Sequence, residues 1–110
     1  MTAPGANVHV LVVAERFDSA AVPAFKEEAK AALLEAPPLV LDLSKTRFVD
    51  SAGLGAMIGI LKECNRKPRR MALAGLSPEV RQIFELTRLH MLFDIYESVP
   101  QAAASLNPCG

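Results

Sequence analysis

The chain has 110 residues, in which 12 Lys and Arg residues balance 12 Asp and Glu residues to give a formal net charge of zero. This length suits one compact domain, and a composition with 51% hydrophobic and 22% charged residues is that of a globular protein. Because the chain has no excess of Lys and Arg, its composition argues against binding to nucleic acid or to an anionic membrane.

The sequence also lacks the usual signs of export and of metal binding. No apolar run approaches the ~20 residues that span a bilayer, and the first five residues do not resemble a signal peptide, so we expect a cytoplasmic protein. Cys64 and Cys109 lack CxxC spacing, and His9 and His90 have no partner at ligand spacing. We therefore expect no disulfide, no metal and no cofactor.

The first half of the chain predicts two strands separated by an amphipathic helix. Residues 8–13 form a β-branched apolar run typical of a buried strand. Asp18 offers cap chemistry for a helix over residues 23–36, and Pro37 and Pro38 end that helix. Residues 39–43 predict a second strand, and Phe48 and Val49 follow it after a polar turn at 44–46. The apolar side of the helix is expected to be Phe25, Ala29, Ala32, Leu33 and Ala36.

The next elements follow a turn at residues 50–53. A helix begins there, followed by a polar link over 65–69 and a third strand over 70–74. The buried side of this helix is expected to be Leu54, Met57, Ile58 and Leu61.

The last third of the chain predicts two helices around a fourth strand. Ser77 is the expected cap, and Pro78 the first residue, of the third helix. Residues 92–96 predict the strand, and Ser98 with Gln101 forms a capping box for a short last helix. The buried side of the third helix is expected to be Val80, Ile83, Phe84 and Leu86.

Strands that alternate with helices in this way require crossover connections. The sequence therefore predicts an α/β fold with a mixed, mostly parallel sheet of about four strands and about four helices packed against it. We expect residues 1–110 to form a single domain, with a flexible N-terminus over residues 1–7.

The turn before the second helix is the most informative segment for function. Ser51 is expected at or next to the helix N-cap, where unpaired N–H groups and the helix dipole favour a phosphate, although the Asp50 carboxylate opposes it. Gly53 and Gly55 are expected to leave this surface without side-chain bulk, so that another protein can come close. On local chemistry alone, the simpler interpretation, that Asp50 and Ser51 only cap a helix, stays open.

Three segments carry a family resemblance. The first comprises residues 40–44 and 48–55, of which 50–55 are the D-S-x-G-L-G sequence. The second comprises residues 76–80, 83–87 and 92–96 in the C-terminal half, and the third is residues 15–18, in a loop that is Gly-Glu-Leu-Asp-like in the family. With these segments the chain resembles a STAS domain, and specifically the bacterial anti-sigma-factor antagonists. The D-S-x-G-L-G sequence is the most specific part of the resemblance.

The resemblance implies a binding protein, not an enzyme, that works by partner switching. The unphosphorylated antagonist binds a serine kinase that is also an anti-sigma factor, and so frees the sigma factor. The kinase, which supplies the ATP, then phosphorylates Ser51 and ends the binding, and a PP2C-type phosphatase reverses the modification. By the same matching, Asp18, Asp50, Ser51, Gly53 and Leu54 belong to the surface that faces the kinase.

The chain departs from the family pattern at several positions. Ala52 replaces a frequent second Ser or Thr, which leaves Ser51 as the only hydroxyl in the turn. The N-terminal strand usual in the family is expected to be missing or very short. Arg88 stands where glycine often ends the third helix, and because a left-handed residue is costly without glycine, we expect a different helix end there.

Two other functions stay open. A non-switching STAS adapter subunit of a lipid-transport or stress-sensing complex would carry Ser or Thr at the same turn but bind independently of phosphate. A small enzyme or ligand-binding domain is less favoured, because no cluster of His, Cys and carboxylate side chains is evident. Whichever function applies, we expect the chain to be a monomer in isolation.

Overall fold

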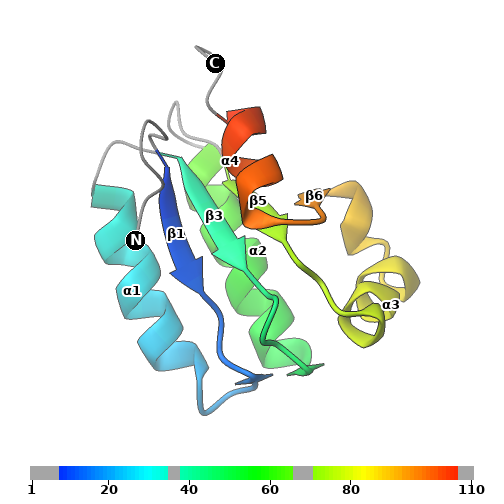
Figure 1. Cartoon of the computed structure of the whole chain (residues 1–110). Helices are drawn as coiled ribbons and strands as arrows, with labels where there is room; N and C mark the ends of the chain where they lie inside the picture. The colour runs from blue at the N-terminus through cyan, green and yellow to red at the C-terminus, as the bar shows by residue number, and fades with distance from the viewer. Residues whose placement is uncertain (1–7, 35–37, 66–70, 107–110) are drawn as a thin grey trace.

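The computed structural model describes residues 8–34, 38–65 and 71–106, and its centre is a four-stranded sheet (Figure 1). The strands lie in the order β1-β3-β5-β6, and all three neighbouring pairs are parallel. Their bounds are β1 His9–Val12, β3 Leu39–Asp42, β5 Met71–Ala74 and β6 Asp94–Tyr96. The predicted α/β fold with a mostly parallel sheet is confirmed. Three predictions concern residues that the structure does not describe. They are the flexible N-terminus, the N-terminal strand expected to be missing or very short, and most of the polar link over 65–69.

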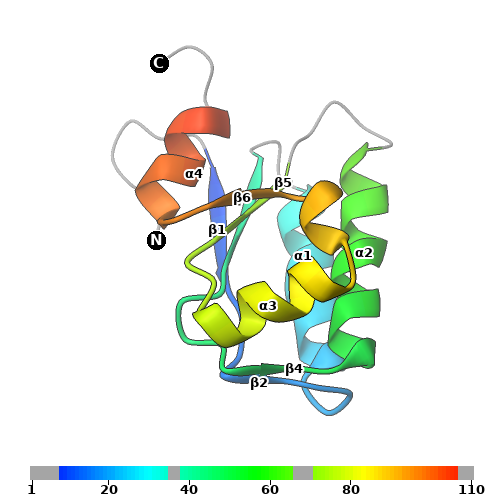
Figure 2. The same cartoon turned by 90° about the vertical axis from the view of Figure 1, so that its right-hand side faces the viewer.

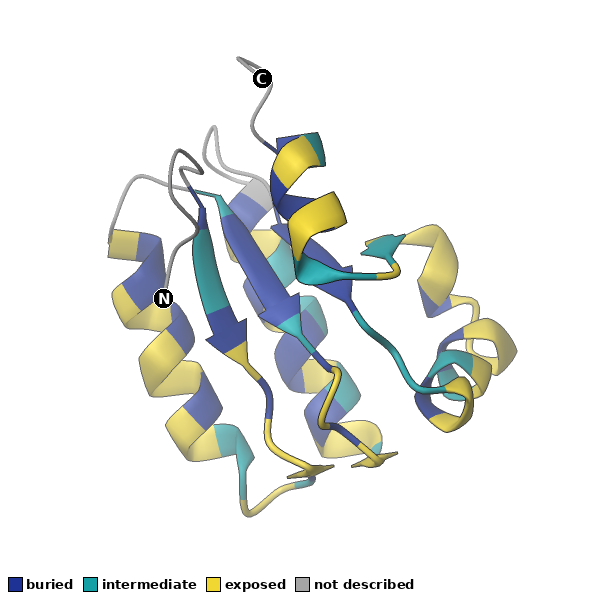
Figure 3. Ribbon diagram, in the orientation of Figure 1, coloured by how far each residue is buried: buried dark blue, intermediate teal, exposed yellow. Residues whose placement is uncertain are grey.

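Helices cover both faces of this sheet (Figure 2). Helices α1 (Val22–Leu34) and α2 (Ser51–Asn65) lie side by side on one face, and α4 (Val99–Leu106) lies on the other. Helix α3 (Pro78–Leu86) and the 3-10 turn η1 (Leu89–Met91) lie beyond β5 and β6. The apolar core is correspondingly divided into a large cluster under α1, α2 and α3 and a smaller one under α4. The two central strands, β3 and β5, are buried over most of their length, as Figure 3 shows.

A second, two-stranded sheet lies at the carboxyl edge of the first. Its strands, β2 (Arg16–Phe17) and β4 (Phe48–Val49), are parallel, with Arg16 opposite Phe48 and Phe17 opposite Val49. This pairing joins the segment after β1 to the segment that leads into α2. The sequence places Phe48 and Val49 after the second predicted strand, but it predicts neither β2 nor β4 as a separate strand.

Helix α2 buries a different side from the one predicted. Met57 is fully buried as expected, but Leu54, Ile58 and Leu61 are only partly buried at the flank of the core. The side of α2 that faces the core includes small residues as well as large ones. The small residues let the helix lie close to the elements beside it. The residues on this side are Gly53, Ala56, Met57, Ile60 and Cys64.

The end of α3 contradicts two expectations. Leu86 is 76% exposed, because the helix ends there and its last residue extends past the core. Arg88 adopts the left-handed conformation that we expected it to avoid, with φ 61° and ψ 16°. The turn is supported by the Thr87 hydroxyl, which donates to the Ile83 carbonyl at 2.7 Å, and by the burial of Leu89 directly after it.

The predicted fourth strand is shorter than expected. Residues 89–91 form η1, and β6 begins only at Asp94. Phe93 is buried instead against Phe84, with ring centroids 5.8 Å apart.

The predicted helix starts are confirmed. The Ser77 hydroxyl accepts a hydrogen bond from the Val80 N–H at 3.3 Å, and Pro78 is the first residue of α3. The Ser98 hydroxyl accepts from the Gln101 N–H, and the Gln101 side chain reaches back to the Glu97 N–H. Ala36 and Cys109 lie outside the described residues, while Cys64 is buried in the core.

Candidate functional site

Ser51 is the exposed first residue of α2, and this helix begins at the carboxyl edge of the central sheet (Figure 1). Asp50 is the N-cap: its carboxylate accepts a hydrogen bond from the Gly53 N–H at 3.0 Å, and its carbonyl accepts from the Leu54 N–H at 3.0 Å. Ser51 therefore stands next to the N-cap, as the sequence predicted.

The start of α2 leaves two backbone donors available. Asp50 occupies the Gly53 N–H, but the N–H groups of Ser51 and Ala52 have no acceptor among the described residues. These donors carry the partial positive charge of a helix N-terminus. An anion attached to the Ser51 hydroxyl would lie beside them.

Gly53 is needed for packing within the chain. A Cβ atom at this position would lie 2.5 Å from the Phe17 carbonyl oxygen and 2.9 Å from Cδ2 of its ring. The missing side chain therefore makes room for β2, and the open surface expected at Gly53 is absent. Gly55 does fit that expectation, because it is exposed and a Cβ there would meet nothing within 4 Å.

Asp18 organises the start of α1 on the neighbouring loop. Its Oδ1 accepts from the N–H groups of Ala20 and Ala21 at 3.1 and 3.3 Å, and its Oδ2 lies 3.0 Å from Nε of Arg16. Partial desolvation raises the pKa of Asp18, but the hydrogen bonds from Arg16, Ala21 and Ala20 outweigh it, so the pKa lies below its usual value. The carboxylate is thus held in its charged form.

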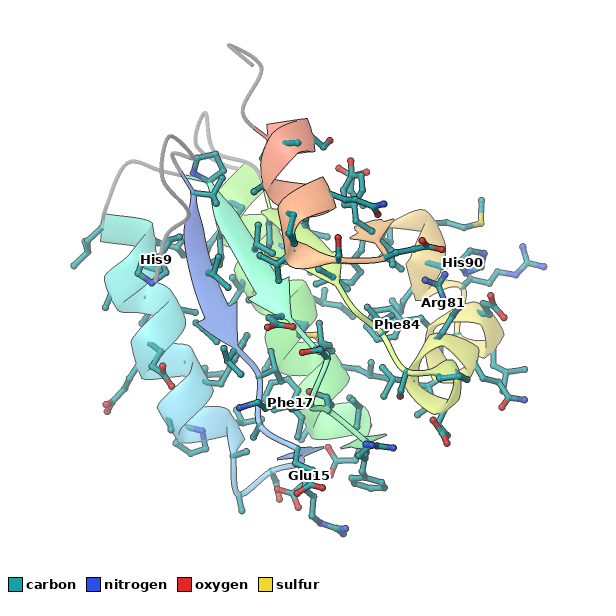
Figure 4. All side chains as sticks on the ribbon, viewed as in Figure 1. His9, Glu15, Phe17, Arg81, Phe84 and His90 are labelled. Carbon is teal, nitrogen blue, oxygen red and sulfur yellow. The ribbon has the colours of Figure 1, made fainter. Side chains whose placement is uncertain are left out.

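The small sheet relates the segments that carry the two acidic residues, Asp18 and Asp50. Phe17 lies opposite Val49, and the Asp50 N–H donates to the Phe17 carbonyl at 3.3 Å. Asp18 and Asp50 are consequently the residues that directly follow the paired Phe17 and Val49. The labelled Phe17 and Glu15 mark this edge of the molecule in Figure 4. Leu54 lies one turn further along α2 and is half-buried against the core.

Sequence reasoning missed Arg16 and Phe48 as parts of this site. Besides its bond to Asp18, the Arg16 guanidinium lies over the Phe48 ring, 4.4 Å from the centroid. The spacing of Arg16 and Asp18 was a usable signal, because residues two apart in an extended segment share a face.

Thr46, assigned to a polar turn, is buried and connects three segments around the site. Its hydroxyl donates to the Ala14 carbonyl at 2.9 Å, with the Val13 carbonyl at 3.3 Å. Its own carbonyl accepts from the Ser77 hydroxyl at 3.4 Å. This threonine therefore ties the loops after β1 and β3 to the start of α3.

The described residues hold no group of three His, Cys, Asp or Glu side chains arranged for a metal ion. His9 at the start of β1 and His90 in η1 lie on opposite sides of the molecule (Figure 4). Over residues 8–34, 38–65 and 71–106, no helix combines the length and apolar character needed to span a bilayer. What the arrangement offers chemically is the exposed Ser51 hydroxyl at the start of α2.

Comparison with known proteins agrees with this geometry. An anti-sigma F factor antagonist of Paenibacillus polymyxa is 32% identical over 68 residues, which cover 62% of this chain and 58% of that protein. The crystal structure of an anti-sigma factor antagonist from Mycobacterium paratuberculosis is similar over 91% of this chain and 86% of its own, with 27% identity and a TM-score of 0.82. The phosphorylated form of the Bacillus cell fate determinant SpoIIAA has the same fold, with 20% identity, a TM-score of 0.68 and 87% of each chain covered.

The relatives are named as antagonists and not as enzymes, in line with the expectation of a binding protein. The family model of the STAS domain matches residues 3–102. The chain therefore belongs to the STAS domain family.

Proposed function

We propose that this chain is an anti-sigma-factor antagonist that acts by partner switching. Unphosphorylated, it binds an anti-sigma serine kinase in the cytoplasm and frees the sigma factor. Phosphorylation of Ser51 by that kinase, with the kinase's own ATP, ends the binding, and a PP2C-type phosphatase restores it. The names of its sequence relatives support this role, and the observation that carries it is the exposed Ser51 hydroxyl next to the N-cap of α2.

The physical basis of the switch is a change of charge on a small contact surface. A phosphate adds about −1.5 to −2 charges at pH 7. At Ser51 this charge is added next to the Asp50 carboxylate, so the local potential becomes more negative. A partner that fits the uncharged hydroxyl then meets repulsion and an uncompensated desolvation cost, which together can amount to several kcal/mol at a buried contact.

The same modification leaves the fold intact. A negative charge beside a helix N-terminus is stabilising by ~0.3–1 kcal/mol, and the Ser51 and Ala52 N–H groups are available to the phosphate. The switch therefore acts on docking and not on folding. SpoIIAA, which shares the fold, has been solved in a phosphorylated form.

The proposed contact surface consists of Asp18, Asp50, Ser51 and Leu54, with Gly53 holding α2 against β2. Residues 1–110 are proposed to form one STAS domain. In this proposal Gly53 does not touch the kinase itself. It is buried against Phe17, and its role is to let α2 lie close to β2.

The test uses purified anti-sigma serine kinases of the organism that encodes the chain. With kinase and ATP, intact-mass spectrometry is expected to show one added phosphate on the wild type and none on Ser51→Ala. Calorimetry is expected to show kinase binding by the wild type and Ser51→Ala, and a loss of binding for Ser51→Asp. Equal binding of Ser51→Ala and Ser51→Asp to one partner would contradict the switch and indicate the non-switching adapter.

A further inference from the structure

A groove runs along the outer surface between α1 and α2. It consists of two hollows of about 420 Å³ each, which share Lys30, Ile60 and Glu63. The first hollow begins beside Ala52, directly after Ser51, and the second ends at the exposed Leu34. Most of the lining is apolar, so the groove is a surface that a partner can cover.

The α2 wall of the groove contains two glycines that the fold itself does not require. A Cβ at Gly55 or at Gly59 would meet nothing within 4 Å, in contrast to Gly53, where it would strike Phe17. Glycine in the interior of a helix is destabilising relative to alanine, and neither residue has the positive φ that would explain it. The absence of these side chains lets another backbone come close to α2.

The α1 wall gives the groove a charge. Lys26 and Lys30 line it, are exposed, and form no ion pair with any residue that the structure describes. Glu63 lies at the far end of the first hollow. A partner with acidic side chains opposite the two lysines is therefore electrostatically favoured.

The groove is continuous with the proposed phosphorylation site. Ser51, Gly55 and Gly59 are four residues apart and follow one side of the helix. A segment that lies along Gly55 and Gly59 therefore passes Ser51. An acidic segment attracted by the lysines would be repelled by a phosphate at that end.

From these features we infer that the groove receives a helix of the anti-sigma kinase, with small residues against Gly55 and Gly59 and acidic residues opposite Lys26 and Lys30. This inference rests on the proposed function and adds the docking mode. The α2 wall from Ala52 to Glu63 rises by roughly 17 Å at about 1.5 Å per residue, which accommodates about three turns of the partner helix.

The experiment measures binding of the unphosphorylated chain to the kinase that phosphorylates Ser51. Gly59→Met fills the groove and is expected to weaken binding by roughly tenfold or more. Ala31→Met adds the same side chain on the exposed side of α1 outside the groove and is the matched control. The double variant Lys26→Glu, Lys30→Glu is expected to weaken binding and to reduce the dependence of the affinity on salt concentration. Lys62 lines neither hollow, so Lys62→Glu is expected to change neither quantity.

The outcomes separate this inference from the proposed function. If no kinase binds the wild type, the proposed function fails and the groove loses its occupant. If the wild type binds in a phosphate-dependent way but Gly59→Met binds equally well, only the docking mode is overturned. Sedimentation that shows a wild-type dimer broken by Gly59→Met would assign the groove to a second copy of the chain and also overturn it.

Discussion

The guanidinium of Arg16 lies over the ring of Phe48, 4.4 Å from its centroid, while its Nε contacts Asp18 at 3.0 Å. The two residues face each other across the β2–β4 pair, so one side chain bridges the loop before α1 and the strand before α2. Because Arg16 is largely exposed, this contact contributes modestly, at about 0.5–1 kcal/mol.

We therefore expect Phe48→Ala to lower the free energy of unfolding slightly and to loosen Arg16. Urea denaturation followed by circular dichroism measures the first effect. The NMR signal of the Arg16 Nε–H, which should shift and exchange faster with water, measures the second. An unchanged Arg16 signal would show that the stacking does not position the guanidinium.

Gly53 and Gly55 form a matched pair in the first turns of α2. Gly53→Ala places a methyl group 2.5 Å from the Phe17 carbonyl and should destabilise the protein by about 1–3 kcal/mol. Gly55→Ala enters open space in the helix and should stabilise it by up to about 1 kcal/mol. Urea denaturation of both variants checks the opposite signs, and equal effects would contradict the close approach of α2 and β2.

Asp50 caps α2 through its bond to the Gly53 N–H. Asp50→Ala removes this acceptor and should cost about 0.5–2 kcal/mol, whereas Asp50→Asn keeps an acceptor oxygen and should cost much less. Thermal unfolding of the two variants makes the comparison. A similar loss in both would show that charge, and not the cap bond, accounts for the contribution of Asp50.

Thr46 has a buried hydroxyl between two loops. Thr46→Val keeps the shape but leaves the Ala14 carbonyl without its donor, so we expect a loss of about 1–3 kcal/mol. Thr87→Val also removes a hydroxyl bonded to carbonyls, but its site is exposed and water can replace it, so the loss should be smaller. Chemical denaturation of the pair tests whether burial sets the difference.

The lowered pKa of Asp18 predicts a pH dependence. Because the folded-state pKa is below the unfolded-state value, the charged carboxylate stabilises the fold at neutral pH. That contribution is lost as the pH falls through the two pKa values, below about pH 4. Between pH 7 and pH 3, Asp18→Asn should lose less stability than the wild type. Glu27→Gln, on the exposed side of α1, is the control and should follow the wild type.

Much of the candidate site follows from local sequence. The caps at Asp50, Ser77 and Ser98 are recognisable because a cap depends on residues three positions away at most. The strands and helices of the parallel sheet follow from apolar periodicity, which depends on near neighbours as well. The placement of Ser51 next to a helix start therefore required no tertiary information.

The rest depended on contacts between segments far apart in the chain. Strand β2 has only two residues and exists through its pairing with β4, about thirty residues away. The inward side of α2, the exposure of Leu86 and the left-handed Arg88 were each decided by which neighbours lie against them. The sequence thus determined the elements and the position of the hydroxyl, because these depend on short-range hydrogen bonds and periodicity. Only the tertiary structure decided that Gly53 serves Phe17 while Gly55 and Gly59 face open space, because that difference lies in what other segments bring beside the helix.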